Sequence, residues 1–137
     1  MKKGRNKKMV NWTTVTVGFV VTIVLEIIGL LFKPVDMEVA TFISLFAPLI
    51  GGLIAAYWAG GTFKDGAVNG GLAGGLGSLI IAIISVQGSL AIIAQNAIFS
   101  FVISAIAGII GGLIGVLAKG NHKEKEENMK EETSKEE

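Results

Sequence analysis

The stretch GAVNGGLAGGLGSLIIAIISVQGSLAIIAQNAIFSFVISAIAGIIGGLIGVLA, residues 66–118, contains no Asp, Glu, Lys or Arg. A soluble helix needs a polar face toward water, and this stretch supplies none. As one helix it would be roughly 80 Å long, whereas the hydrocarbon core of a bilayer is about 30 Å thick. The chain therefore turns back once, at the polar residues 86–89. Two membrane spans result, at about residues 66–86 and 97–118.

Two more apolar segments precede this stretch, at residues 12–32 and 37–60. The first follows a basic leader, residues 1–11, and is longer than the apolar region of about 7–15 residues found in a signal peptide. It therefore predicts an uncleaved first span. Asp36 is suited to cap the second span, and Asp65 to cap the third after the turn at Gly60 and Gly61. Pro48 predicts a bend inside the second span.

The fold class predicted is all-α, an integral membrane bundle of four transmembrane helices. A weak internal repeat, IGGLI at residues 50–54 and again at 110–114, suggests two duplicated helical hairpins. Glycine and isoleucine dominate both segments, so chance similarity stays open as the alternative.

The positive charges predict the orientation. One side of a four-span chain would hold the five cations of the leader, Lys64 and the five lysines of the tail, whereas the other would hold Lys33 alone. Positive loops stay in the cytoplasm, so both termini are expected there, in the cell membrane. Residues 119–137 form a charged tail with little to bury, which predicts disorder. Oppositely charged pairs such as Lys123 with Glu127 leave a frayed helix open.

Small residues recur at every fourth position in the later spans. Because lipid is as apolar as leucine, helices in a bilayer associate by close approach at such residues. These rows predict helix packing, and the same rows are available for self-association into a homo-oligomer. The predicted packing residues are Gly66, Gly70, Gly74, Gly52, Gly108 and Gly112.

Glu26 is the ionisable residue that lies well inside a span. It follows Thr14, Gly18 and Thr22 at four-residue spacing, so all four share one face of the first helix. An intramembrane carboxylate indicates an ion or proton site. The alternative is that Glu26, within about 10 Å of the outer surface, is merely hydrated or protonated there.

The remaining polar residues have ordinary explanations: capping or a loop contact for Asn69, and interface placement for Gln95 and Asn96. No catalytic, cofactor-binding or metal-binding motif is recognisable, and the sequence has no cysteine. We therefore expect no enzymatic activity, no cofactor and no nucleic-acid partner. Membrane lipid is the expected surrounding, and any small-molecule ligand stays open.

Residues 60–70, GGTFKDGAVNG, and the closing IIGGLIG at 109–115 resemble a family of small glycine-rich, four-span archaeal membrane proteins classed only as a domain of unknown function. The resemblance covers roughly residues 11–118. It implies a four-span fold and brings no substrate or mechanism with it.

A second, local resemblance involves LEIIG at residues 25–29, followed by Lys33. This segment is similar to the first helix of small multidrug resistance transporters, which also have four spans. The resemblance implies that Glu26 couples proton and drug-cation binding. The later spans lack the aromatic residues and the glycine motif of that family, which puts the carry-over of this role to Glu26 in doubt.

Three functional hypotheses follow. The first is a non-enzymatic structural or assembly protein that packs through its glycine rows. The second is a small proton- or cation-coupled transporter or channel that uses Glu26. The third is a holin-like pore former, suggested by the small size, the several spans and the charged tail.

Overall fold

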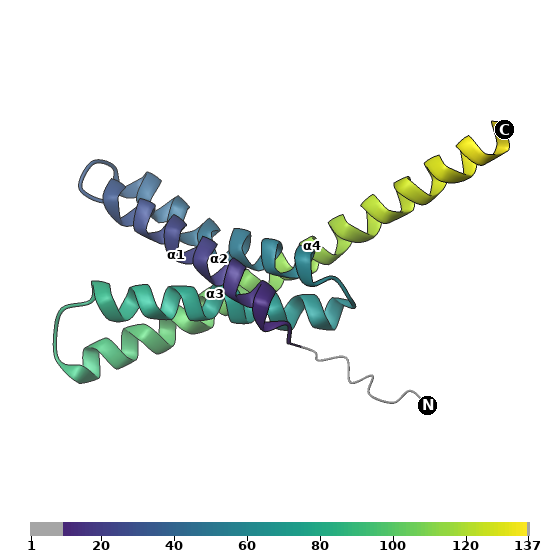
Figure 1. Ribbon diagram of the computed structural model, residues 1–137. Coiled ribbons are helices and arrows are strands. Elements are labelled where there is room, and N and C mark those ends of the chain that lie inside the picture. Colours follow the sequence, from purple (N-terminus) through teal and green to yellow (C-terminus); the bar gives the residue numbers. More distant parts are fainter. Residues whose placement is uncertain (1–9, 137) are drawn as a thin grey trace, which may run out of the picture.

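The computed structural model describes residues 10–136, and four helices make up most of that part of the chain (Figure 1). They are α1 (Trp12–Phe32), α2 (Met37–Ala59), α3 (Phe63–Ser85) and α4 (Leu90–Glu136). No strand occurs among residues 10–136. The predicted basic leader, apart from its last two residues, lies outside the described residues.

All four helices are long and apolar enough to cross a membrane. Helices α1, α2 and α3 contain 21, 23 and 23 residues, and about 20 apolar residues are needed to span the hydrocarbon core. The predicted fold class, an all-α membrane bundle of four transmembrane helices, is therefore confirmed.

The first two helices begin at capping residues. The side chain of Asn11 accepts a hydrogen bond from the Thr14 amide at 3.5 Å. Asp36 is the cap of α2, as predicted, because its carboxylate accepts bonds from the amides of Glu38 at 2.9 Å and Val39 at 3.1 Å. Helix α2 ends at Ala59, one residue before the predicted end, since Gly60 adopts a φ of 65°.

The start of α3 differs from the prediction. The helix begins at Phe63, and Thr62, not Asp65, is its cap. The Thr62 hydroxyl accepts from the Asp65 amide at 3.3 Å, and the Asp65 carboxylate accepts from the Thr62 amide at 2.8 Å. This reciprocal capping box satisfies two amides at once, so it wins over a cap at Asp65 alone.

Helix α4 is longer than predicted at both ends. It begins at Leu90, after a turn in which the Ile93 amide donates to the Ser89 carbonyl at 3.0 Å, and the apolar residues 90–94 form its first turn. It also continues to Glu136 through the tail for which disorder was predicted. Paired side chains four residues apart support such a helix, and His122 lies 3.2 Å from Glu126, a pair that is ionic only when the imidazole is protonated.

Two antiparallel hairpins, α1–α2 and α3–α4, build the bundle. They cross near the middle of the helices and diverge toward the ends that carry the α1–α2 and α3–α4 loops (Figure 1). Helix α2 contacts both α3 and α4, and α1 contacts α3, whereas α1 and α4 do not touch within residues 10–136. The second half of α4 extends away from the other helices as a single rod (Figure 1).

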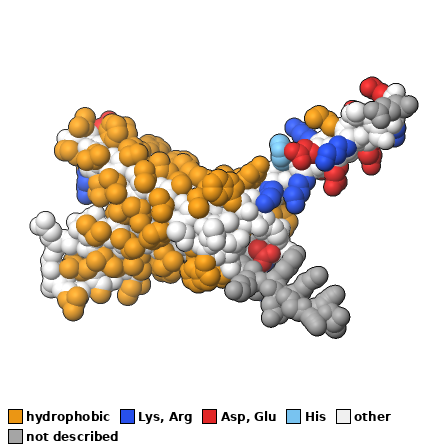
Figure 2. All heavy atoms as spheres, viewed as in Figure 1, with side chains coloured by type: hydrophobic (Ala, Val, Ile, Leu, Met, Phe, Trp, Pro, Cys, Tyr) orange, Lys and Arg blue, Asp and Glu red, His pale blue; other side chains and the backbone are white. Residues whose placement is uncertain are grey.

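The interior is built from small side chains, and the large apolar ones face outward. Val15, Ala55 and Ala73 form a buried cluster, and alanine is the commonest buried apolar residue of the described chain. Leucine, isoleucine and phenylalanine side chains cover the outside of the bundle (Figure 2). This arrangement suits a lipid surrounding, in which close backbone approach rather than burial of large side chains holds helices together.

Candidate functional site

Glu26 lies inside the bundle, with only 7% of its surface exposed. The residues that precede it at four-residue spacing, Thr14, Gly18 and Thr22, are buried as well. The polar face of α1 is therefore turned toward the other helices. Six residues, or roughly 9 Å of helix, separate Glu26 from the end of α1 at Phe32.

The Glu26 carboxyl group meets α3 across the junction of the two hairpins. Its Oε1 accepts a hydrogen bond from the hydroxyl of Ser78, which is 1% exposed. The carbonyl oxygen of Ser78 accepts a longer bond, 3.4 Å, from the hydroxyl of Ser100 in α4. A short polar path thus links α1, α3 and α4 inside an otherwise apolar layer.

Thr22 closes the space one turn before Glu26. Its hydroxyl donates to the carbonyl of Gly18 at 2.9 Å, which satisfies the buried oxygen within the helix. A Cβ atom added to Gly51 in α2 would lie 3.2 Å from the Thr22 Cβ, and one added to Gly77 in α3 would lie 2.8 Å from it. Thr22 therefore fills the gap between α2 and α3 and separates Glu26 from the inner half of the bundle.

This arrangement suits exchange of a proton or a small cation. A carboxyl group can gain or lose a proton, and a serine hydroxyl can either donate to it or accept from it. Carboxylate and hydroxyl oxygens are also ligands for hard cations. Among the described residues Glu26 is the only acidic or basic side chain that is buried. Its burial argues against hydration of the carboxyl group and leaves a protonated, neutral carboxyl group as the alternative.

The predicted packing glycines lie at close contacts between α2, α3 and α4. An added Cβ at Gly52 would lie 2.8 Å from the Gly108 Cα, and one at Gly70 would lie 2.8 Å from the Gly112 Cα. Because the obstacle in both cases is backbone, these helices touch main chain to main chain. The other close approaches involve Gly66 with the Gly112 carbonyl, and Gly74 with Pro48 and the Ser104 carbonyl.

Asn69, for which capping or a loop contact was expected, contacts the residue that precedes α1. Its side chain is 1% exposed, and its Oδ1 accepts from the backbone amide of Asn11 at 2.8 Å while its Nδ2 donates to the carbonyl of Asp65 at 2.7 Å. It therefore ties the start of α1 to the first turn of α3. The signal in the sequence was an amide side chain on the glycine-rich face of α3.

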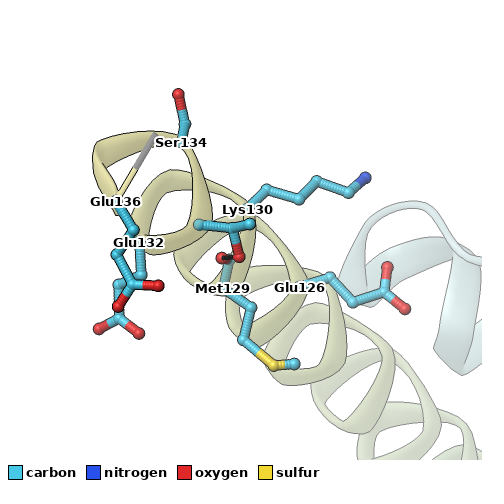
Figure 3. A pocket seen from close by; sticks show the side chains of 7 residues that line it. Glu126, Met129, Lys130, Glu132, Ser134 and Glu136 are labelled. Atoms are coloured by element: carbon cyan, nitrogen blue, oxygen red, sulfur yellow. Dashed lines mark hydrogen bonds between the residues drawn. The ribbon is translucent and has the colours of Figure 1, made fainter.

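Gln95, Asn96 and the hollow on the tail do not add to this site. Gln95 and Asn96 are exposed on α4, and Asn96 donates to the Ile92 carbonyl at 2.9 Å. A hollow of about 770 Å³ on the tail is lined by side chains of α4 alone, which spread outward from one helix (Figure 3). Within residues 10–136 no three acidic or histidine side chains are placed to hold a metal ion.

Four apolar helices and an inward-facing carboxyl group define a multi-pass α-helical membrane protein. No curated protein and no solved structure matches the chain. The family model DUF5518, described as a family of unknown function, matches residues 12–118, and the chain belongs to this family. The match covers the four apolar segments and excludes the charged tail, residues 119–137.

Proposed function

We propose that the protein is a non-enzymatic, small proton- or cation-coupled transporter in which Glu26 binds the coupling ion. The observation that carries this proposal is the burial of the Glu26 carboxyl group at the junction of the two hairpins. A carboxyl group inside a bilayer is costly, and such groups mark ion and proton pathways. A purely structural contact between α1 and α3 does not require an ionisable side chain.

The position of Glu26 supports a coupling role. Its bond to Ser78 joins α1 of one hairpin to α3 of the other, so a change in the charge of the carboxyl group acts on the contact between two separate units. The hairpins diverge on the side of Glu26 that leads to their loops (Figure 1). Binding that weakens this bond therefore favours a rearrangement of one hairpin against the other.

We place the protein in the cell membrane with both termini in the cytoplasm. The charge distribution supports this orientation, because eleven of the 12 cations fall on the side of the termini and Lys33 alone falls on the other. In this orientation Glu26 lies in the half of the bundle nearer the cell exterior, and membrane lipid surrounds the outward-facing apolar residues.

Proton flux into vesicles tests the proposal. The full-length protein is reconstituted into liposomes with a pH-sensitive dye inside, and an imposed pH gradient or a gradient of Na⁺ or K⁺ is applied. Wild-type protein should move protons, and Glu26→Gln should reduce the rate to that of empty liposomes. Glu38→Gln is the matched control, because Glu38 is an exposed carboxylate at the start of α2. Equal flux through wild type and Glu26→Gln would refute the proposal.

A structural or assembly role is the second candidate, and the glycine contacts within the chain favour its structural part. The predicted packing glycines meet neighbouring helices of the same chain. They are therefore engaged within one chain, and self-association would have to use the outward-facing apolar surface. Crosslinking in native-like membranes followed by mass measurement separates the two candidates. A stable homo-oligomer combined with no ion flux would favour the assembly role.

A further inference from the structure

A hollow lies where α2 ends, α3 begins and the apolar part of α4 gives way to the charged tail. Its volume is about 400 Å³, and its wall includes Gly60 and Gly61 from the turn and, from α4, seven residues between Val116 and Glu124. The apolar segments of three helices stop at this level, so the hollow sits at the boundary between hydrocarbon and headgroups. It is remote from Glu26, which lies nearer the opposite ends of the helices.

The α4 wall of this hollow carries two cations one helical turn apart. Lys119 and Lys123 both line it, and the Lys119 ammonium group donates to the Trp58 carbonyl at 3.4 Å. That bond holds the Lys119 side chain against the end of α2. Glu124 is the one acid in the lining, so the wall has a net positive charge, and Asn121 adds an amide donor. Basic side chains gather where the tail leaves the apolar body (Figure 2).

The remaining wall is apolar and opens toward the bilayer. Phe63, Val116 and Leu117 line the hollow, and Phe63 and Leu117 are 54% and 51% exposed on the outside of the bundle. A hollow with cations at the level of the headgroups and apolar side chains below them is amphipathic in the same sense as a phospholipid. A free inorganic anion has no apolar part that could contact this wall, whereas the acyl chains of a lipid can contact it.

We infer that this hollow binds an anionic phospholipid. The phosphate is held by Lys119 and Lys123, and the acyl chains lie along Phe63 and Leu117. Basic pockets between transmembrane helices bind the headgroups of anionic lipids in this way. A zwitterionic lipid carries its own cation and gains less from the two lysines. The site ties the α2–α3 turn to α4 through a lipid, and it does not depend on the proposed role of Glu26.

Lipid retention by the full-length protein tests this inference. The protein is purified in mild detergent, incubated with phosphatidylglycerol or phosphatidylcholine, and examined by native mass spectrometry. Wild-type protein should retain phosphatidylglycerol preferentially. The double change Lys119→Gln with Lys123→Gln should weaken retention of phosphatidylglycerol roughly 30-fold, because it removes two contacts between a lysine and the anionic headgroup. The matched control, Lys130→Gln with Lys135→Gln, removes two lysines of the same helix outside the hollow and should retain it as wild type does.

Two further measurements keep the inference falsifiable. Glu124→Gln removes the opposing charge and should strengthen phosphatidylglycerol retention, which no loss of folding would produce. Inorganic phosphate at millimolar concentration should not displace the lipid, and displacement would show that the site binds free phosphate instead. Equal retention of both lipids, or equal loss in the two double-lysine variants, would overturn the inference.

Discussion

Two halves of the bundle are held together in different ways: the half next to the α2–α3 turn, here called the inner half, and the half next to the α1–α2 and α3–α4 loops, here called the outer half. In the inner half Gly52, Gly70, Gly108 and Gly112 bring helix backbones into direct contact, and no ionisable side chain is buried there among the described residues. In the outer half a single carboxyl group, on Glu26, bridges the two hairpins through a serine hydroxyl. The backbone contact has no titratable group, whereas the polar contact can change its charge. The two halves should therefore respond differently to substitution and to pH.

The largest effect is expected from a side chain that obstructs the backbone contact of the inner half. Gly70→Ala places a Cβ 2.8 Å from the Gly112 Cα, and neither helix can yield without moving its main chain. We expect a loss of about 3 kcal/mol or more in the free energy of unfolding. Unfolding in mixed micelles of increasing SDS content, followed by circular dichroism, measures it.

Its neighbour Gly71 provides the matched control. An added Cβ there meets the Ile109 side chain at 2.9 Å, and that side chain can change its rotamer toward lipid. Gly71→Ala should therefore cost less than half as much as Gly70→Ala. Equal losses for the two variants would mean that backbone approach is not what holds α3 against α4.

The second effect concerns the polar contact of the outer half. Ser78→Ala leaves the buried Glu26 carboxyl group without the hydroxyl that donates to it, which should cost roughly 1–3 kcal/mol. The same SDS titration measures the loss, and the liposome assay should show altered ion flux. Ser85→Ala, at the exposed end of the same helix, should change neither. Unchanged stability and flux in Ser78→Ala would remove the bond from the account.

A smaller effect is expected at the inner ends of α1 and α3. Asn69→Ala removes the acceptor for the Asn11 amide and the donor to the Asp65 carbonyl. The loss in the free energy of unfolding should be about 1 kcal/mol, because the Asn11 amide at the start of α1 can then form a hydrogen bond to water. Hydrogen exchange at the first turn of α1 should rise while exchange near Glu26 stays unchanged. A rise along the whole helix would show that Asn69 holds more than the terminus.

The smallest effect is expected in the tail. The His122–Glu126 pair is more than half exposed on both sides, and exposed pairs contribute between 0 and about 1 kcal/mol. His122→Ala should therefore leave the unfolding of the bundle unchanged and lower the helical signal only slightly. A shift of the bundle's unfolding midpoint would mean that the tail contacts the transmembrane helices.

The sequence predicts well those features that depend on local chemistry. Charge-free length predicts four membrane spans, and Asp36 after Pro34 predicts the start of α2. The start of α3 was misplaced because Thr62 and Asp65 are both good caps, and only their reciprocal bonding decides between them. For the tail, composition left two outcomes open, disorder or a frayed helix, and residues 119–136 continue α4 as a helix.

The site is predictable only in part. The four-residue spacing from Thr14 to Glu26 indicates that the carboxyl group faces inward, because one helix suffices to define a face. Its partner, Ser78, continues the row Gly66, Gly70 and Gly74 at four-residue spacing, which indicates a packing face but not that this face meets Glu26. The hydrogen bond between Asn69 and Asn11 is likewise a tertiary contact, and no pattern along α1 or α3 predicts it.

Infrared titration of the Glu26 carboxyl group measures whether this buried group binds a proton or a cation. Full-length protein in liposomes is titrated with acid and then with Na⁺ or K⁺ while the carboxyl stretching region is recorded. If Glu26 binds the ion, one band should respond to the ion and differ from the bands of exposed carboxyl groups. That band should shift in Ser78→Ala, disappear in Glu26→Gln and persist in Glu38→Gln. A wild-type spectrum identical to that of Glu26→Gln at every ion concentration would contradict ion binding by Glu26.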